Sequence, residues 1–154
     1  MPEVLFYHLE RASLEDVLPG LLEKTRERGW KALVRVGSHE RLEELDSHLW
    51  TYREESFLPH STNLDARAAE QPVLLTTADG NPNGANVAFF TDGAVPEDWT
   101  SDMVRACQRV VLMFDGRDPA AMESARAQWK LARATGYDTT YWQQTDQGRW
   151  EKKA

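Results

Sequence analysis

The sequence predicts a single α/β domain with a mostly parallel central sheet. Short apolar runs that suit strands alternate with longer segments whose apolar residues recur at helical spacing. This alternation favours parallel strands joined by crossover helices on both faces, a three-layer sandwich. A length of 154 residues suits one domain with one hydrophobic core. We therefore expect one α/β domain over residues 1–142, followed by a polar C-terminal tail over residues 143–154.

The first strand and helix are expected before Gly29. Residues 3–9 form an apolar run typical of a strand, and Ser13 with Asp16 resembles a capping box that begins a helix. Pro19 interrupts the helical pattern, so it predicts either a kink or the true first turn. Gly29 is expected to end this helix.

The rest of the chain continues the same alternation of strands and helices, with a less regular segment over residues 52–70. The run before Asp115 is apolar enough for a central strand. Further predicted elements are strands over residues 30–36, 72–77, 86–91, 108–114 and 138–143, a helix that Ser38 caps, and a long helix from Pro119 to about Thr135.

Charge and composition exclude several classes of protein. The net charge of −7 disfavours direct binding of nucleic acid as the main activity. The N-terminus lacks the basic region of a signal peptide and no apolar run is long enough to span a membrane, so we expect a cytoplasmic protein without membrane contact. Basic residues nevertheless gather in the last third of the chain, which suggests one face for an anionic partner. They are Arg105, Arg109, Arg117, Arg126, Lys130, Arg133, Arg149, Lys152 and Lys153.

The motifs of nucleotide binding and catalysis are missing. The first strand runs into Glu10-Arg11-Ala12-Ser13, without the glycines that let backbone amides surround a phosphate. His39 and Glu43 share a helix face but lack a third metal ligand, and Cys107 begins an apolar strand, as a buried cysteine would. We expect no catalytic residue, metal or cofactor, and keep a nucleotide-dependent enzyme with an unusual loop as the alternative.

The final helix carries the pattern most suggestive of binding. Arg126, Lys130 and Arg133 are spaced by four and three residues, so they line one stripe of the helix, and Trp129 flanks it. Cations pair with carboxylates while an aromatic ring receives an apolar end group, so this stripe suits an acidic peptide with a hydrophobic terminus. A merely solvated basic face, with Trp129 and Tyr137 in the core, remains the alternative.

A second cluster of interest consists of Phe57-Leu58-Pro59-His60, preceded by Trp50 and Tyr52. These aromatic and apolar side chains either fold into the core or form an exposed patch for a partner protein. The sequence pattern does not decide between the two interpretations.

Taken together, these segments resemble the chi subunit of the bacterial DNA polymerase III holoenzyme. The resemblance covers nearly the whole chain and rests on four blocks of sequence. They are Leu5-Phe6-Tyr7-His8-Leu9, Leu49-Trp50 with Glu55-Ser56-Phe57-Leu58-Pro59-His60, Val110 to Asp115, and Ala125-Arg126 through Trp129-Lys130 to Gly136-Tyr137.

The resemblance implies a non-enzymatic adaptor with a Rossmann-like fold. Members of that family bind the acidic C-terminal tail of the single-stranded-DNA-binding protein, and bind the psi subunit or another clamp-loader protein, so they contact DNA only indirectly. By motif, the expected tail-binding residues are Arg126, Trp129, Lys130, Arg133, Gly136 and Tyr137. The expected psi-facing residues are Trp50, Phe57, Pro59 and His60.

Overall fold

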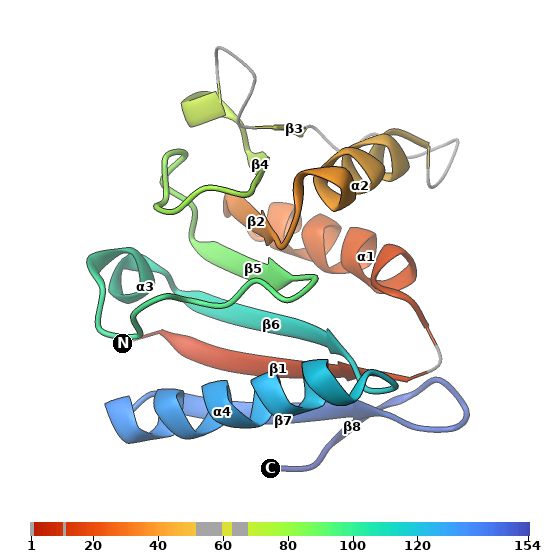
Figure 1. The fold of residues 1–154 in the computed structure, drawn as a ribbon. Coiled ribbons are helices and arrows are strands. Elements are labelled where there is room, and N and C mark those ends of the chain that lie inside the picture. The colour runs from red at the N-terminus through yellow and green to blue at the C-terminus, as the bar shows by residue number, and fades with distance from the viewer. Residues whose placement is uncertain (1, 11, 52–59, 63–67) are drawn as a thin grey trace.

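The computed structural model describes residues 2–10, 12–51, 60–62 and 68–154, whose strands form one sheet with helices on both faces (Figure 1). In chain order the elements are β1 (Glu3–Leu9), α1 (Leu14–Glu27), β2 (Ala32–Val36), α2 (His39–Thr51), β3 (Ser61–Thr62), a 3-10 helix (Ala68–Glu70), β4 (Val73–Thr76), β5 (Val87–Thr91), α3 (Asp102–Ala106), β6 (Arg109–Asp115), α4 (Pro119–Thr135), β7 (Asp138–Gln144) and β8 (Trp150–Lys152).

The strand order is β3-β4-β2-β5-β6-β1-β7-β8. Every neighbouring pair is parallel except β7 and β8, which are antiparallel. The central strands β2, β4 and β5 are buried along their whole length, as expected for a sheet covered on both faces. The predicted α/β fold with a mostly parallel sheet is therefore confirmed.

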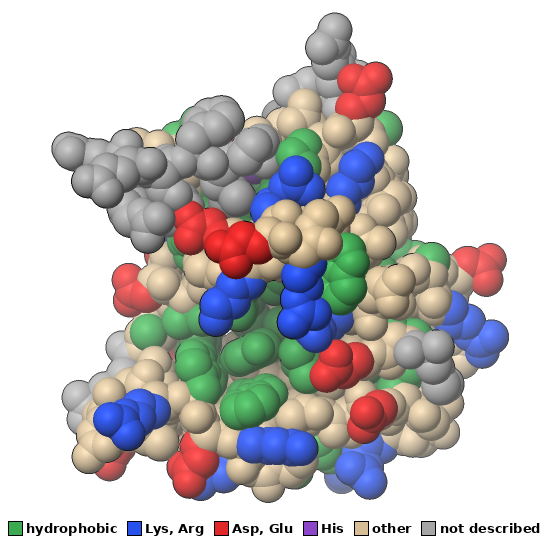
Figure 2. All heavy atoms as spheres, turned by 180° about the vertical axis from the view of Figure 1, so that it is seen from behind, with side chains coloured by type: hydrophobic (Ala, Val, Ile, Leu, Met, Phe, Trp, Pro, Cys, Tyr) green, Lys and Arg blue, Asp and Glu red, His purple; other side chains and the backbone are tan. Residues whose placement is uncertain are grey.

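Alternation along the strands separates two apolar cores. Leu5 and Val34 pack with α1 and α2 on one face, whereas Val4 and Phe6 pack with α3 and α4 on the other. In Figure 1 α4 lies in front of the sheet, and Figure 2 shows the molecule from behind, on the α1 side. No helix in the described part of the chain is both long and apolar enough to cross a lipid bilayer.

Pro19 lies inside α1 and is tolerated because a neighbouring helix satisfies the backbone group that it frees. Proline lacks an N–H, so the carbonyl four residues earlier, that of Glu15, loses its helical partner. His48 of α2 replaces it, with its Nε2 atom 2.7 Å from the Glu15 oxygen. The predicted capping box of Ser13 and Asp16 is present at the start of the same helix. The carbonyl that the proline leaves free thus receives a contact that links α1 to α2.

The last residues of the chain extend the sheet. The sequence predicts a polar tail after a last strand, but the structure continues the sheet with β8 beyond β7. The half-buried Trp150 of β8 packs edge-on against Tyr7, with ring centroids 5.1 Å apart. The packing of this one indole ring on Tyr7 anchors the tail. The polar residues around Trp150 in the sequence give no sign of this contact.

Candidate functional site

The long helix α4 has well-defined ends. Asp118 caps its start, where the carboxylate accepts a hydrogen bond of 3.0 Å from the backbone N–H of Ala120, and Pro119 occupies the first turn. At its C-terminal end Gly136 has a φ of 95°, the left-handed conformation that glycine adopts without strain. The side chains between these caps therefore have fixed positions on the helix surface.

The inner side of α4 is held against the sheet by small and aromatic residues. Ala125 and Ala132 are buried and let the helix approach the strands closely. Trp129 is half-buried, with its ring edge-on to Phe6 at 5.3 Å and to Tyr141 at 5.8 Å between centroids. Trp129 thus keeps one part in the core and presents another part to the surface.

The outer side of α4 carries the predicted cationic stripe. Arg126, Lys130 and Arg133 are all exposed, and the Arg133 guanidinium lies 5.6 Å from the centre of the Trp129 ring. Within the described part of the chain none of the three forms an ion pair with a carboxylate. Their charges are held in solvent around a partly exposed indole, an arrangement that can receive carboxylates beside an apolar group.

The last two residues of the predicted tail-binding set, Gly136 and Tyr137, hold the end of α4 in place. Gly136 forms the C-cap, and Tyr137 is only 4% exposed, in the core beneath the helix end. The Tyr137 hydroxyl donates a hydrogen bond to the buried backbone carbonyl of Trp99. These two residues therefore fix the end of α4, whereas Arg126, Trp129, Lys130 and Arg133 make its surface.

Sequence reasoning missed Tyr141, which extends the aromatic surface from β7. In register with Phe6 on β1, it faces α4 and contacts Trp129. Its hydroxyl lies 2.7 Å from His8 Nδ1, and burial raises the pKa of Tyr141, an effect that the nearby Arg126 charge opposes. Alternation within the predicted strand 138–143 placed Tyr141 on one sheet face, but which face depends on pairing with β1.

The second predicted cluster lies at the other end of the sheet. Trp50, at the end of α2, is 51% exposed, and its ring centroid lies 4.3 Å from that of His60. His60 is 4% exposed, with its Nε2 atom 3.2 Å from both the backbone oxygen and the carboxylate of Asp46. His60 thus supports Trp50 from below, while Phe57 and Pro59 lie outside the described residues.

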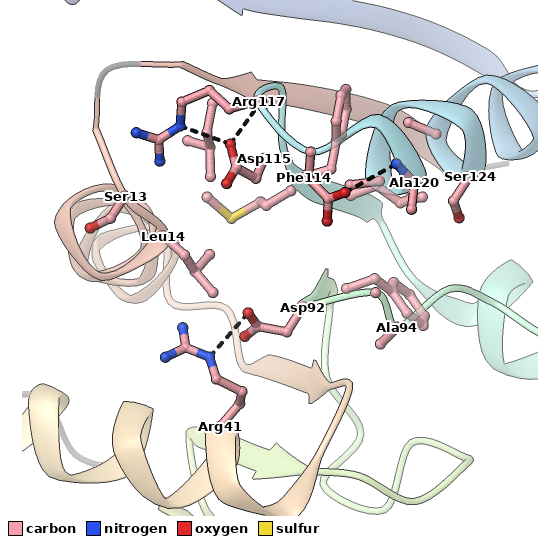
Figure 3. Close-up of a pocket in the computed structure, with 18 of the residues that line it drawn as sticks. Ser13, Leu14, Arg41, Asp92, Ala94, Phe114, Asp115, Arg117, Ala120 and Ser124 are labelled. Carbon is pink, nitrogen blue, oxygen red and sulfur yellow. Dashed lines mark hydrogen bonds and ion pairs between the residues drawn. The ribbon is translucent and has the colours of Figure 1, made fainter.

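A pocket lies at the carboxyl ends of β1, β5 and β6, the end of the sheet at which α/β proteins usually bind ligands (Figure 3). Its volume is about 690 Å³. The starts of α1 and α4 both face it, but the capping box of Ser13 and Asp16 occupies one and Asp118 with Pro119 occupies the other. The Ser13 hydroxyl and the Asp118 carboxylate thus already accept from the N–H groups at the two helix starts, and the pocket gives the nucleotide alternative no support.

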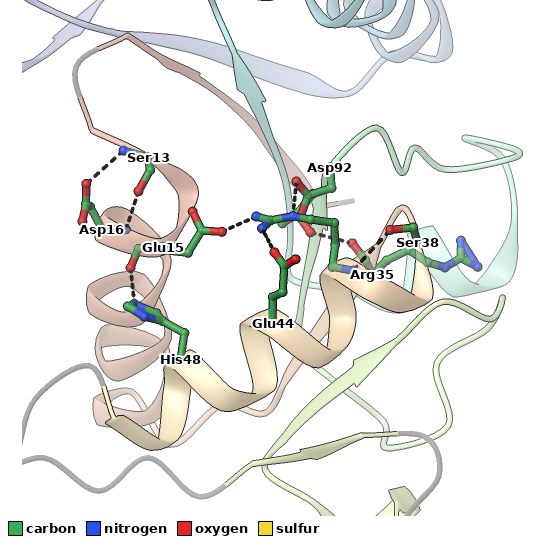
Figure 4. A network of polar contacts seen from close by, with 10 residues as sticks. Ser13, Glu15, Asp16, Arg35, Ser38, Glu44, His48 and Asp92 are labelled. Carbon is green, nitrogen blue, oxygen red and sulfur yellow. Dashed lines mark hydrogen bonds and ion pairs between the residues drawn. The ribbon is translucent and has the colours of Figure 1, made fainter.

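One wall of this pocket is an ion network that ties three segments together (Figure 4). Arg41 of α2 pairs with Glu15 of α1, with Glu44 of its own helix and, at 3.1 Å, with Asp92 after β5. Burial raises the pKa of Asp92 above its usual range, although Arg41 opposes the effect. Because each carboxylate already faces the guanidinium, the network is best explained as a structural clamp.

Fold and surface together define an α/β protein with an exposed cationic helix. The mostly parallel sheet carries helices on both faces but no glycine-rich phosphate loop, and its longest helix presents cations without a described ion-pair partner on the same stretch as the half-buried Trp129. Comparisons with known proteins identify the family. The model of the family "DNA polymerase III chi subunit, HolC" matches residues 1–140. This chain belongs to the chi-subunit family of DNA polymerase III, whose members are accessory, non-catalytic subunits of the replicative holoenzyme.

Two curated relatives agree with the family match. The chain is 30% identical over 120 residues to the probable DNA polymerase III subunit chi of Rickettsia prowazekii (strain Madrid E), covering 75% of this chain and 71% of that protein. It is 31% identical over 123 residues to the DNA polymerase III subunit chi of Pseudomonas aeruginosa PAO1, covering 76% and 77%. Membership also confirms the resemblance seen in the sequence and places the chain in DNA replication.

Proposed function

We propose that this chain is a replication adaptor that binds the acidic C-terminal tail of the single-stranded-DNA-binding protein on α4. The observation that carries the proposal is the half-buried Trp129 ring with Arg133 beside it and the exposed Arg126 and Lys130 on the same helix; none of these cations pairs with a described carboxylate. An acidic peptide with a hydrophobic last residue would pair its carboxylates with the cations and place the apolar group on the indole. Such local complementarity acts in spite of the net charge of −7.

We also propose that the surface around Trp50 contacts the psi subunit, or another clamp-loader protein where psi is absent. The exposed indole at the end of α2 supports this, because a large exposed apolar side chain is a common anchor in protein interfaces. Helix α2 packs over β2 and β4, whereas α4 packs over β6, β1 and β7 (Figure 1). The two helices cover different strands on opposite faces of the sheet, which supports simultaneous binding of two partners.

Titration with two fluorescent peptides tests the tail-binding proposal. One peptide is acidic and ends in Pro-Phe with a free carboxylate, and the other lacks only the final Phe. We expect the first to bind with a dissociation constant of about 1 µM, about −8 kcal/mol, a value typical of a small peptide contact. Deletion of the last residue removes the group expected on Trp129, so binding should fall below detection.

The outcome of this titration is interpretable in either direction. Equal binding of the two peptides would mean that only charge is recognised, and it would remove Trp129 from the proposed site. Absence of binding by both peptides would refute the tail-binding proposal and leave the family membership and the fold unchanged.

A further inference from the structure

A second surface rich in cations and aromatic rings lies on the face opposite α4. Helix α1 packs over β2 and β6, while Tyr7, Trp142 and Trp150 on the neighbouring strands stay partly exposed. Figure 2 shows this face, where a hollow lined by hydrophobic side chains lies beside Lys and Arg side chains. We call it the rear surface and define it by Tyr7, Lys24, Arg28, Trp30, Arg109 and Trp150.

A small pocket forms the centre of the rear surface. Its volume is about 130 Å³, and Leu5, Leu21 and Val111 are among the apolar residues that line it. The aromatic rings of Tyr7 and Trp30 also line it. A cavity of ~150 Å³ holds a benzene molecule, so this pocket has the size of one planar ring.

Only positive charges line this pocket. Lys24, Arg28 and Arg109 contribute to its wall, and no described carboxylate does. The guanidinium groups of Arg28 and Arg109 lie 5.1 and 5.8 Å from the centre of the Trp30 ring. Arg109 is partly neutralised by Glu3 at 3.2 Å.

Two of these cations are available to a ligand. Lys24, in the last turn of α1, and Arg28, its C-cap residue, are exposed, and neither forms an ion pair within the described residues. The whole chain has a net charge of −7, so the positive charge around this ring-sized pocket is local to this face. Its chemistry suits a ligand that carries both negative charge and planar rings.

The same chemistry continues beyond the pocket toward the C-terminal hairpin. Tyr7 contacts the Trp150 ring of β8 at 5.1 Å, and Lys152 of the same strand is exposed and in register with the half-buried Trp142. Aromatic rings and cations thus repeat from α1 across β1 to β8. A peptide with one terminal aromatic residue would need only the pocket, whereas a chain of bases and phosphates would use the whole width.

We propose that the rear surface binds single-stranded DNA directly, with phosphates near Lys24, Arg28 and Lys152 and bases on the partly exposed aromatic rings. This contact is separate from the peptide surface on α4, and it adds a direct DNA contact to an adaptor otherwise expected to reach DNA through a protein. The net negative charge of the chain makes the interaction weak, and the cation–phosphate contacts make it weaken further as salt is added.

Fluorescence anisotropy with a labelled oligothymidylate of about 15 nucleotides, a length that covers one binding surface of this size, tests the proposal. The variant Lys24→Ala/Arg28→Ala is compared with Arg126→Ala/Lys130→Ala, which removes the same charge from the opposite face. We expect the first variant to bind about tenfold more weakly and the second to bind like the unaltered protein. Loss of two phosphate contacts should also reduce the slope of log K against log salt by about 1.4.

Three results would overturn the proposal. The first is no binding by the unaltered protein at about 20 mM salt, where electrostatic binding is strongest. The second is an equal loss in both variants, which would indicate binding without a defined site. The third is a loss of binding to the Phe-ended peptide, but not to the oligonucleotide, in Lys24→Ala/Arg28→Ala, which would make the rear surface a peptide site.

Discussion

Removing two cations from α4 gives the sharpest prediction about peptide binding. In the variant Arg126→Ala/Lys130→Ala both deleted side chains are exposed, and neither forms an ion pair within the described residues. Alanine is also a better helix former than either residue it replaces. The free energy of unfolding should therefore stay within about 0.5 kcal/mol of the original, as is usual for surface substitutions away from specific contacts.

The expected loss of affinity follows from the same exposure. An exposed ion pair contributes roughly 0.2–1 kcal/mol, and pairing with a partly desolvated carboxylate falls at the upper end. Two cations at about 1 kcal/mol each give about 2 kcal/mol, equivalent to an increase in dissociation constant of about thirtyfold. From about 1 µM, the constant should thus rise to about 30 µM.

Isothermal titration calorimetry with the Phe-ended acidic peptide measures this change directly. Lys24→Ala/Arg28→Ala is the matched control, because it removes the same charge from the far face and should leave peptide affinity unchanged. Unaltered affinity in Arg126→Ala/Lys130→Ala would refute the assignment of the peptide to α4. An equal loss in both variants would show that net charge, and not the stripe, determines binding.

Three further predictions concern the core and its surroundings. Tyr137→Phe leaves the buried carbonyl of Trp99 without its hydroxyl donor, so the melting temperature should fall by about 4 °C for a cost of ~1–2 kcal/mol, and an unchanged thermal unfolding curve would contradict this. Gly37→Ala would place a Cβ atom 1.8 Å from the backbone oxygen of Asp92, so urea denaturation should show a loss of about 3 kcal/mol or more, whereas a stable variant would mean that the two loops separate easily. Burial raises the pKa of Cys107 to about 11, so a disulfide reagent at about pH 8 should react slowly with the native protein and quickly in guanidinium, and a fast native reaction would contradict the buried position.

Local pattern was sufficient for the elements that depend on periodicity. The helical spacing of Arg126, Lys130 and Arg133 predicts that they share one stripe, because helix geometry alone determines which side chains lie on the same face. The apolar runs of β1 and β6 were recognisable because both strands are covered on each side. These parts of the site and fold required no knowledge of distant contacts.

Features that depend on pairing between distant segments were not predictable. Tyr141 joins the α4 surface only because β7 pairs with β1, and Trp150 is anchored only because β8 brings it over Tyr7. The sequence pattern left open whether His60 faces a partner or the core, and the structure buries it beside Asp46. The sequence around His60 does not show whether its side chain contacts a partner protein or packs against Trp50.

The C-terminal hairpin also determines how the sheet ends. Without it, β7 would present an edge of free N–H and C=O groups along Asp138–Gln144, and such edges pair with other chains and promote aggregation. Trp150–Lys152 occupies the part of that edge from Trp142 to Gln144, and further backbone hydrogen bonds join Tyr141 to Lys153 and Ala154. The outer strand is short, carries Glu151 and Lys152 and is followed by Lys153, charges that discourage any further strand from adding. The segment after Gln144 therefore covers part of the sheet edge, and a chain cut there should fold yet form oligomers that size-exclusion chromatography would detect.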